Sequence, residues 1–160
     1  MGRLFGTDGV RGIANEDLTN ELAMKIGSAA ATVLLEESKS AKPTVLIGKD
    51  TRASGDICSV GCNVLSVGVV PTPAVAYLVG QYQCEAGIMI SASHNPCEYN
   101  GIKIFQKTGY KLDDSIEDEI EQIILDNSRE PSIKIGGDVG NRLFCKTAVN
   151  DYIEHVVSTT

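Results

Sequence analysis

One short segment contains the residue types from which a phosphoryl-transfer site is built. It is the hexapeptide Ser-Ala-Ser-His-Asn-Pro at 91–96, and it follows directly on the apolar run 86–90. Asn and Pro favour turns, so the hydroxyl of Ser93 is expected on a turn at the end of a strand. Lys103 follows on what reads as the next strand. A fixed hydroxyl with a cation nearby suits a serine that carries and transfers a phosphoryl group.

The residues alone leave two alternatives open for this segment. A hydrolytic serine would need a base, but His94 adjoins Ser93, and adjacent side chains of an extended segment diverge. His155 is the only other histidine and lies far along the chain. The Gly-x-Ser-x-Gly elbow of hydrolases is also absent, so a catalytic triad is disfavoured. The other alternative is a polar Asn-Pro turn that has only a structural role.

The charge pattern limits the classes of partner. The 160 residues, a length typical of one domain, carry a net charge of −7, and Lys and Arg are scattered along the chain. Nucleic-acid-binding proteins usually concentrate their basic residues on one face, so that class is disfavoured. An acidic protein still binds an anion where a few cations converge. The positions of Arg11, His94 and Lys103 therefore matter more than the net charge.

Cysteine usage and hydropathy predict a cytoplasmic protein. The five cysteines are odd in number and irregularly spaced, which favours reduced, mostly buried thiols over a disulfide framework. Their spacing matches no zinc motif. No apolar stretch approaches the length of a membrane span, and the first six residues lead into no signal core. We therefore expect no membrane partner.

Hydrophobic periodicity predicts an α/β fold. Four segments have apolar residues at helical spacing, with Thr19 and Thr72 as the expected N-caps of the first two: 18–37, 73–82, 113–126 and 148–157. Three short apolar runs are typical of buried strands: 43–48, 64–70 and 86–90. A four-residue connection ending in glycine, between 101–105 and 110–112, predicts a β-hairpin. The expected architecture is a layered, mostly parallel or mixed β-sheet flanked by helices, with this hairpin at its edge.

Two further loops are expected near the 91–96 turn, because ligands of open α/β sheets bind beyond the carboxyl ends of the strands. One is the polar segment 49–56. The other is the glycine-rich segment 6–12, if a strand starts at Leu4 and Phe5. Its glycines match neither the dinucleotide fingerprint nor the phosphate loop with Gly-Lys-Ser/Thr, so neither cofactor class is supported. A flexible turn is the alternative.

The connection between Gly48 and Val64 does not fit this scheme. Parallel strands need a crossover of about a dozen residues or more, usually a helix. This stretch offers a polar loop and then Ile-Cys-Ser-Val-Gly-Cys at 57–62, without a periodic helical segment. Either the crossover is irregular or residues are missing here, and we favour missing residues.

Several motifs together resemble the α-D-phosphohexomutases, in the order in which that family has them. They are Phe-Gly-Thr-Asp-Gly-Val-Arg-Gly at 5–12, Gly-Lys-Asp-Thr-Arg-Ala-Ser-Gly at 48–55, Val-Pro-Thr-Pro at 70–73, Ser-Ala-Ser-His-Asn-Pro at 91–96 and Asn-Gly-Ile-Lys at 100–103. The family commonly has Gly-Arg-Asp where this chain has Gly-Lys-Asp at 48–50. It also places a helix after the Thr-Arg-x-Ser-Gly loop, which gives a second reason to expect missing residues after Asp56.

The resemblance implies a phosphoserine at Ser93. The phosphate of that residue would also be one ligand of Mg²⁺, which is the expected cofactor. His94 would contact the phosphate, and Lys103 and Arg11 would flank it as cations or proton-transfer groups.

Four further residues are implied as supports of the site. Ser91 and Asn95 would shape the loop. Asp50 and Arg52 would be secondary supports, for which a structural salt bridge and a ligand contact are equally open.

The resemblance also implies a reaction and its partners. The opening motif is most similar to the family members that interconvert glucosamine 6-phosphate and glucosamine 1-phosphate through a bisphosphate intermediate, a step toward cell-wall precursors. Phosphomannomutase or phosphoglucomutase activity is one alternative, and a non-catalytic sugar-phosphate-binding module is another. Residues 1–146 would be the first domain, and 147–160 would begin the connection to a second one. The sugar-reading loop and the remaining metal ligands would lie in later domains, so this chain alone is expected to be nearly inactive.

Overall fold

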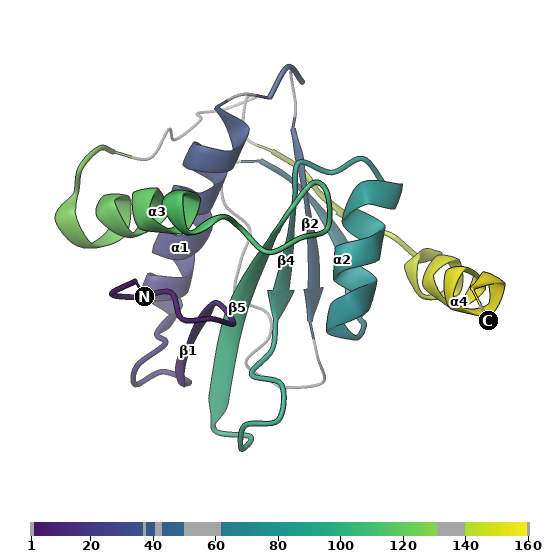
Figure 1. Cartoon of the computed structure of the whole chain (residues 1–160), viewed down its shortest axis with the longest axis horizontal. Helices are drawn as coiled ribbons and strands as arrows, with labels where there is room; N and C mark the ends of the chain where they lie inside the picture. Colours follow the sequence, from purple (N-terminus) through teal and green to yellow (C-terminus); the bar gives the residue numbers. More distant parts are fainter. Residues whose placement is uncertain (1, 37, 41–42, 50–61, 131–139, 160) are drawn as a thin grey trace.

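The protein is a three-layer α/β structure with a central six-stranded sheet (Figure 1). The computed structural model describes residues 2–36, 38–40, 43–49, 62–130 and 140–159. Its elements, in chain order, are β1 (Val10–Ile13), α1 (Asn20–Leu35), β2 (Thr44–Lys49), β3 (Asn63–Val69), α2 (Thr72–Gln81), β4 (Ala86–Ile90), β5 (Tyr99–Gln106), α3 (Asp114–Asp126), β6 (Arg142–Phe144) and α4 (Ala148–Ser158).

The sheet is mixed, as predicted. Its strand order is β1-β5-β4-β2-β3-β6. Strands β4, β2, β3 and β6 run parallel to one another, whereas β5 is antiparallel to both β4 and β1. After β5 the chain reverses at the expected turn, where the Gly109 N–H donates to the Gln106 carbonyl. The returning segment makes a single bridge, Phe105 to Lys111, so the hairpin has one full strand only.

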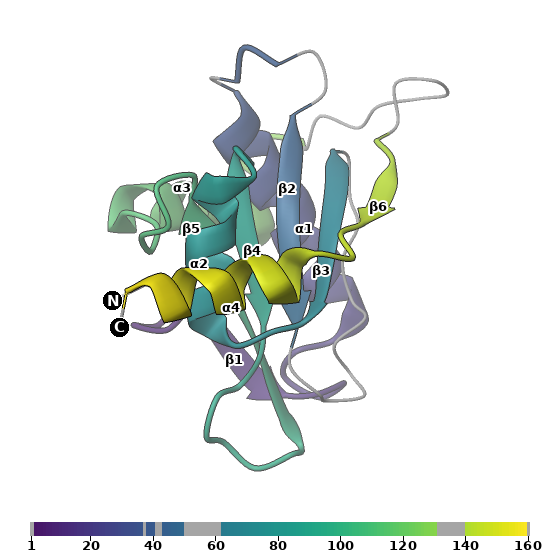
Figure 2. The same ribbon diagram turned by 90° about the vertical axis from the view of Figure 1, so that its right-hand side faces the viewer.

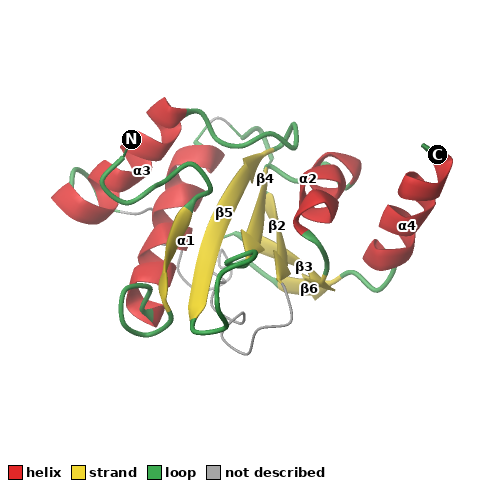
Figure 3. Ribbon diagram, turned by 60° about the horizontal axis from the view of Figure 1, so that its bottom comes forward, coloured by secondary structure: helices red, strands yellow, loops and turns green. Residues whose placement is uncertain are grey.

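The two faces of the sheet carry separate apolar cores. Helices α1 and α3 lie side by side on one face, and α2 covers the other (Figures 1 and 3). Strand β4 is buried at all five positions. Its residues Ala86, Ile88 and Ile90 belong to the core under α1 and α3, and Met89 belongs to the core under α2. The run without polar alternation therefore marks a strand covered on both faces, as expected.

The first residues of α1 and α2 can be compared with the predicted N-caps. The Thr19 hydroxyl accepts the Leu22 N–H at 3.1 Å, which confirms this N-cap of α1. The prediction of Thr72 as the N-cap of α2 is wrong by one residue, because Thr72 is already helical and Pro71 precedes the helix without a side-chain cap. The first four N–H groups of a helix have no intrahelical acceptor, so Pro73 fits the second helical position as well as the first.

The first strand starts later than expected. Residues 4 and 5 are not in a strand, and β1 begins at Val10. The backbone N–H groups of this segment are bonded to a side chain of α3 instead of to a neighbouring strand. The Glu121 carboxylate accepts the N–H groups of Arg3, Leu4 and Phe5 at 2.8, 2.6 and 2.6 Å. Burial alone would raise the pKa of Glu121, but these donors and Arg3 lower it below its ordinary value. The amino-terminal segment is thus held by a buried carboxylate rather than by a neighbouring strand.

The cysteines follow the prediction in part. Cys62 and Cys84 are buried free thiols, and burial raises the pKa of each to about 11. Cys145 is half-buried and Cys97 is exposed, so burial is less general than expected. Cys58 lies outside the described residues. Within the described ranges, no helix is both long enough and apolar enough to cross a bilayer.

Candidate active site

Ser93 lies on an exposed loop that extends past the carboxyl end of β4 (Figure 2). Its backbone is left-handed, with φ of +57°, a conformation that residues other than glycine rarely adopt. Two hydrogen bonds form the loop: the Ser93 N–H donates to the Ser91 hydroxyl at 2.9 Å, and the Asn95 N–H donates to the Ala92 carbonyl at 3.1 Å. Strained backbone of this kind clusters at active sites, where the surrounding structure holds it in place.

The base of this loop is fixed to the sheet. Ser91 is buried, with 4% of its surface exposed, and its N–H donates to the Gly101 carbonyl of β5 at 2.9 Å. The Ser91 hydroxyl accepts the Ser93 N–H, so it contributes a hydrogen bond to the loop conformation. His94 is exposed and Asn95 is half-buried, so both occupy the same surface loop as Ser93.

Arg11 reaches the site from β1, which pairs with β5. In the antiparallel register Arg11 is opposite Gly101, the residue whose carbonyl accepts from Ser91. The Arg11 guanidinium donates through Nη2 to Asp8 at 2.9 Å. Its Nε is buried and lacks a hydrogen-bond partner among the described residues. Buried polar atoms are normally satisfied, and an anion bound here would give this donor an acceptor.

Lys103 lies on the same face of β5 as Gly101. Successive side chains of a strand alternate between faces, so residues 101 and 103 point the same way. Lys103 is in register with Met89 of β4, and it is half-buried. The sheet thus brings Arg11 and Lys103, from two strands, to the face on which the core under α2 packs, near the base of the Ser93 loop.

Two predicted supports cannot be placed. Asp50 and Arg52 lie outside the described residues. The last residue before them, Lys49, ends β2 and is in register with Ile90, immediately before the Ser91 loop.

A magnesium site is not complete in the described part of the chain. That part contains no group of three or more His, Cys, Asp or Glu side chains that could hold a metal ion. Magnesium requires several hard oxygen ligands. A phosphate on Ser93 would give one of them, and the described carboxylates do not supply the others as a cluster.

Gly101 is a residue of the site to which the sequence analysis assigned no role. A Cβ atom at this position would lie 2.8 Å from the Ser91 carbonyl oxygen and 3.1 Å from Cγ of Arg11. The absence of a side chain therefore lets the serine loop and the arginine approach β5 together. The Asn-Gly pair in the motif at 100–103 was the available signal, but its meaning depends on the pairing of β1 with β5.

We expect Gly101→Ala to destabilise the chain by about 1–3 kcal/mol, the usual cost of overpacking. The added methyl group must displace either a backbone carbonyl or the arginine stem. The free energy of unfolding, measured in urea, checks this. The matched control is Gly80→Ala in α2, where the nearest atom to a new Cβ is 3.6 Å away. This helical change should stabilise by about 0.5–1 kcal/mol. Equal effects of the two substitutions would contradict the packing argument.

Comparison with known proteins agrees with this geometry. The model of the phosphoglucomutase/phosphomannomutase α/β/α domain I matches residues 2–131. The chain therefore belongs to the phosphoglucomutase/phosphomannomutase family. A family member of known structure from Burkholderia thailandensis superposes with a TM-score of 0.74 at 23% identity, over 97% of this chain and 35% of that one. This likeness shows the fold.

Two of the similar proteins are phosphoglucosamine mutases. The one from Clostridium novyi is 52% identical over 168 positions, and the one from Thermoanaerobacter pseudethanolicus is 54% identical over 168 positions. Each match covers 99% of this chain and 37% of the relative. The chain thus spans little more than a third of the length of these relatives.

Proposed function

We propose that this chain is the phosphoserine-bearing first domain of a phosphosugar mutase that interconverts glucosamine 6-phosphate and glucosamine 1-phosphate. The observation that carries the proposal is the strained, exposed Ser93 on a loop whose base is bonded to Gly101, the residue opposite Arg11, whose buried Nε lacks a partner among the described residues. The choice of sugar rests on the two relatives named phosphoglucosamine mutase.

The proposed reaction has two phosphoryl transfers. In the first, the P–O bond to the Oγ of phosphorylated Ser93 breaks and a P–O bond forms to the free hydroxyl of the sugar phosphate. The proton of that hydroxyl is transferred to the Ser93 Oγ, which becomes a hydroxyl again. This gives a sugar bisphosphate. In the second, the other phosphoryl group of the reoriented bisphosphate returns to Ser93. Each transfer exchanges one P–O bond for another, so positioning and charge compensation carry the catalysis.

The residues around Ser93 suit this task. A phosphoserine adds about −1.5 to −2 charges. Arg11 and Lys103 supply positive charge from two neighbouring strands, and the buried Nε of Arg11 supplies a donor. The chain itself would hold the phosphate with Arg11, Lys103 and His94. When bound, Mg²⁺ would neutralise further charge, with its remaining ligands outside the described residues.

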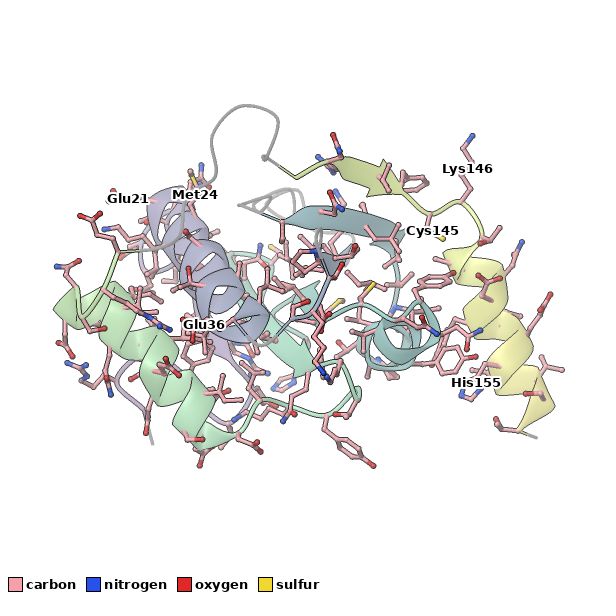
Figure 4. All side chains as sticks on the ribbon, turned by 90° about the horizontal axis from the view of Figure 1, so that it is seen from above. Glu21, Met24, Glu36, Cys145, Lys146 and His155 are labelled. Atoms are coloured by element: carbon pink, nitrogen blue, oxygen red, sulfur yellow. The ribbon has the colours of Figure 1, made fainter. Side chains whose placement is uncertain are left out.

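We further propose that residues 147–160 begin the connection to a second domain. The family-model match ends at residue 131, before α4. Helix α4 lies across α2 (Figure 2), and Figure 4 shows His155 on α4. The His155 ring stacks on the ring of Tyr77, with centroids 3.7 Å apart. Its other side leaves Val149, Ile153 and Val157 about half or more exposed. An apolar helix face of this kind suits packing against additional polypeptide.

We expect the isolated 160-residue chain to accept a phosphoryl group at Ser93 but to turn over glucosamine phosphates at least ~10³-fold more slowly than a full-length enzyme, because the expected sugar-reading loop and metal ligands lie in other domains. A coupled assay of both proteins measures this. Mannose and glucose phosphates, assayed with the full-length enzyme, test the alternative mutase activities. If the isolated chain turned over as fast as the intact enzyme, the proposal that other domains supply the sugar-reading loop and metal ligands would be contradicted.

A further inference from the structure

Asn100 is a buried polar residue on an apolar face of β5. Side chains alternate along a strand, so Asn100 shares its face with Ile102 and Ile104. Both isoleucines belong to the core under α1 and α3, and only 1% of Asn100 is exposed. The pattern of this face calls for an apolar residue at position 100. Polar residues that break such a pattern are expected where the structure serves a function, so the amide of Asn100 indicates a specific role.

The amide oxygen of Asn100 binds a backbone donor of the sheet. It accepts the Gly101 N–H at 2.9 Å. In a hydrogen-bonded pair of an antiparallel ladder, two opposite residues exchange two bonds, each N–H donating to the carbonyl of the other. Ser91 and Gly101 make only one of these bonds in the described structure, in which the Ser91 N–H donates to the Gly101 carbonyl at 2.9 Å. The donor of the second bond, the Gly101 N–H, is bound by Asn100 instead.

The Ser91 carbonyl is turned away from that donor. Its oxygen lies 2.8 Å from the point at which a Cβ atom of Gly101 would stand. A Cβ atom projects from the face of a sheet, whereas the bonds of the ladder run between the strands. The Ser91 oxygen therefore lies over the face of β5 and not in line with the Gly101 N–H. At this residue the chain leaves the sheet and forms the loop that contains Ser93.

We propose that Asn100 is a positioning residue for Ser93. Its amide binds the Gly101 N–H and so removes the donor that would hold the Ser91 carbonyl in the ladder. The ladder ends one bond earlier, and the chain turns out of the sheet at Ser91, which leads to the left-handed backbone of Ser93. Without the amide, the Gly101 N–H would bind the Ser91 carbonyl and draw the loop toward β5. The effect on catalysis rests on the proposed function of Ser93, whereas the exchange of hydrogen bonds does not.

Asn100→Leu in a full-length enzyme that carries this domain tests the effect on catalysis. Leucine resembles asparagine in shape and suits the apolar face, so the fold should be retained. We expect kcat to fall by about 10- to 100-fold, because a small displacement of a reacting group is enough for such a loss. The KM for the sugar phosphate should change by about twofold or less, because the sugar-reading loop is expected in another domain. Tm should stay within about 2 °C of the wild-type value.

Two matched controls separate positioning from stability. Asn100→Asp keeps an oxygen that can accept the Gly101 N–H, so kcat should stay within about threefold of wild type, although the buried charge lowers Tm. Ile104→Val removes a methyl group from the same face, and it should lower Tm by about 2–4 °C without changing kcat. A wild-type kcat in the Asn100→Leu enzyme would overturn the proposal. An Asn100→Asp enzyme as slow as Asn100→Leu would also overturn it.

The hydrogen bond itself can be measured without a variant. In the isotope-labelled 160-residue chain, the NMR scalar coupling across a hydrogen bond identifies the carbon that carries the acceptor oxygen. We expect the Gly101 nitrogen to couple to the side-chain amide carbon of Asn100. A coupling to the Ser91 carbonyl carbon in its place would overturn the proposal, whatever the variants show.

Failure of this inference can be told apart from failure of the proposed function. If Ser93→Ala abolishes mutase activity and Asn100→Leu leaves kcat unchanged, only the role of Asn100 is wrong. If the Ser93→Ala enzyme stays fully active, the proposed function is wrong, and the catalytic role of Asn100 is overturned with it.

Discussion

Replacing Ser93 by alanine in a full-length enzyme is expected to lower the proposed mutase activity by about 10³-fold or more, because the hydroxyl that we propose as the phosphoryl carrier is lost. The substitution is structurally mild. Ser93 is exposed, and alanine at a φ of +57° bears the same backbone strain as serine. The steady-state rate with glucosamine 1-phosphate and a bisphosphate activator measures the effect, and the free energy of unfolding confirms that the fold is retained.

Ser91→Ala is the matched control for this prediction. It keeps the hydroxyl at position 93 but removes the acceptor of the Ser93 N–H. One hydrogen bond of this kind contributes about 1 kcal/mol, so the activity should fall by roughly tenfold or less. A Ser93→Ala enzyme that retains more activity than the Ser91→Ala enzyme would refute the assignment of Ser93 as the carrier.

The largest effect on stability is expected at Glu121. Glu121→Ala should lower the free energy of unfolding by about 3–5 kcal/mol, because three charge-assisted hydrogen bonds are lost and their donors are left in a partly buried site. Only 3% of Glu121 is exposed, and it accepts the N–H groups of Arg3, Leu4 and Phe5. Urea unfolding at neutral pH measures the change.

Asp126 provides the matched control on the same helix. Its carboxylate pairs with the Arg3 guanidinium in an exposed ion pair, and such pairs add little to stability. Asp126→Asn should therefore leave the unfolding midpoint nearly unchanged. If the two substitutions have the same effect, the contribution of Glu121 does not come from the buried backbone donors.

The pH dependence follows from the same contacts. The pKa of Glu121 in the folded chain is below its ordinary value of 4.5. A depressed pKa means that the contribution is fully present above the unfolded value and is lost as pH falls through the folded value. The stability difference between the wild-type chain and Glu121→Gln should therefore shrink below about pH 4.5. A difference that stays constant to pH 2 would contradict the ionised state of this carboxyl.

The sequence was most informative where a local pattern determines the structure. Strand β4 was predicted at 86–90 with its correct bounds, because a strand buried on both faces is a short uninterrupted apolar run. The helix after Thr19 was predicted from its periodicity and cap, and it ends two residues early. The prediction of Ser93 rested on its motif, and its left-handed backbone could not have been derived from residue types alone.

The features that were missed depend on contacts between distant segments. The role of Gly101 requires β1 to pair with β5, which places Arg11 and the Ser91 carbonyl on either side of it. The late start of β1 requires Glu121, more than a hundred residues away, to hold the first residues. A periodic pattern reports which face of an element is apolar, but it does not report which element covers that face.

The central claim is that Ser93 carries the phosphoryl group, and its most direct test is chemical. The chain is incubated with glucosamine 1,6-bisphosphate and then digested with a protease. The peptide that contains residues 91–103 is analysed by tandem mass spectrometry. The account predicts a gain of one phosphoryl group on Ser93 and none in the Ser93→Ala chain. A phosphate found on Ser91, or an unmodified peptide from an enzyme that is fully active, would contradict it.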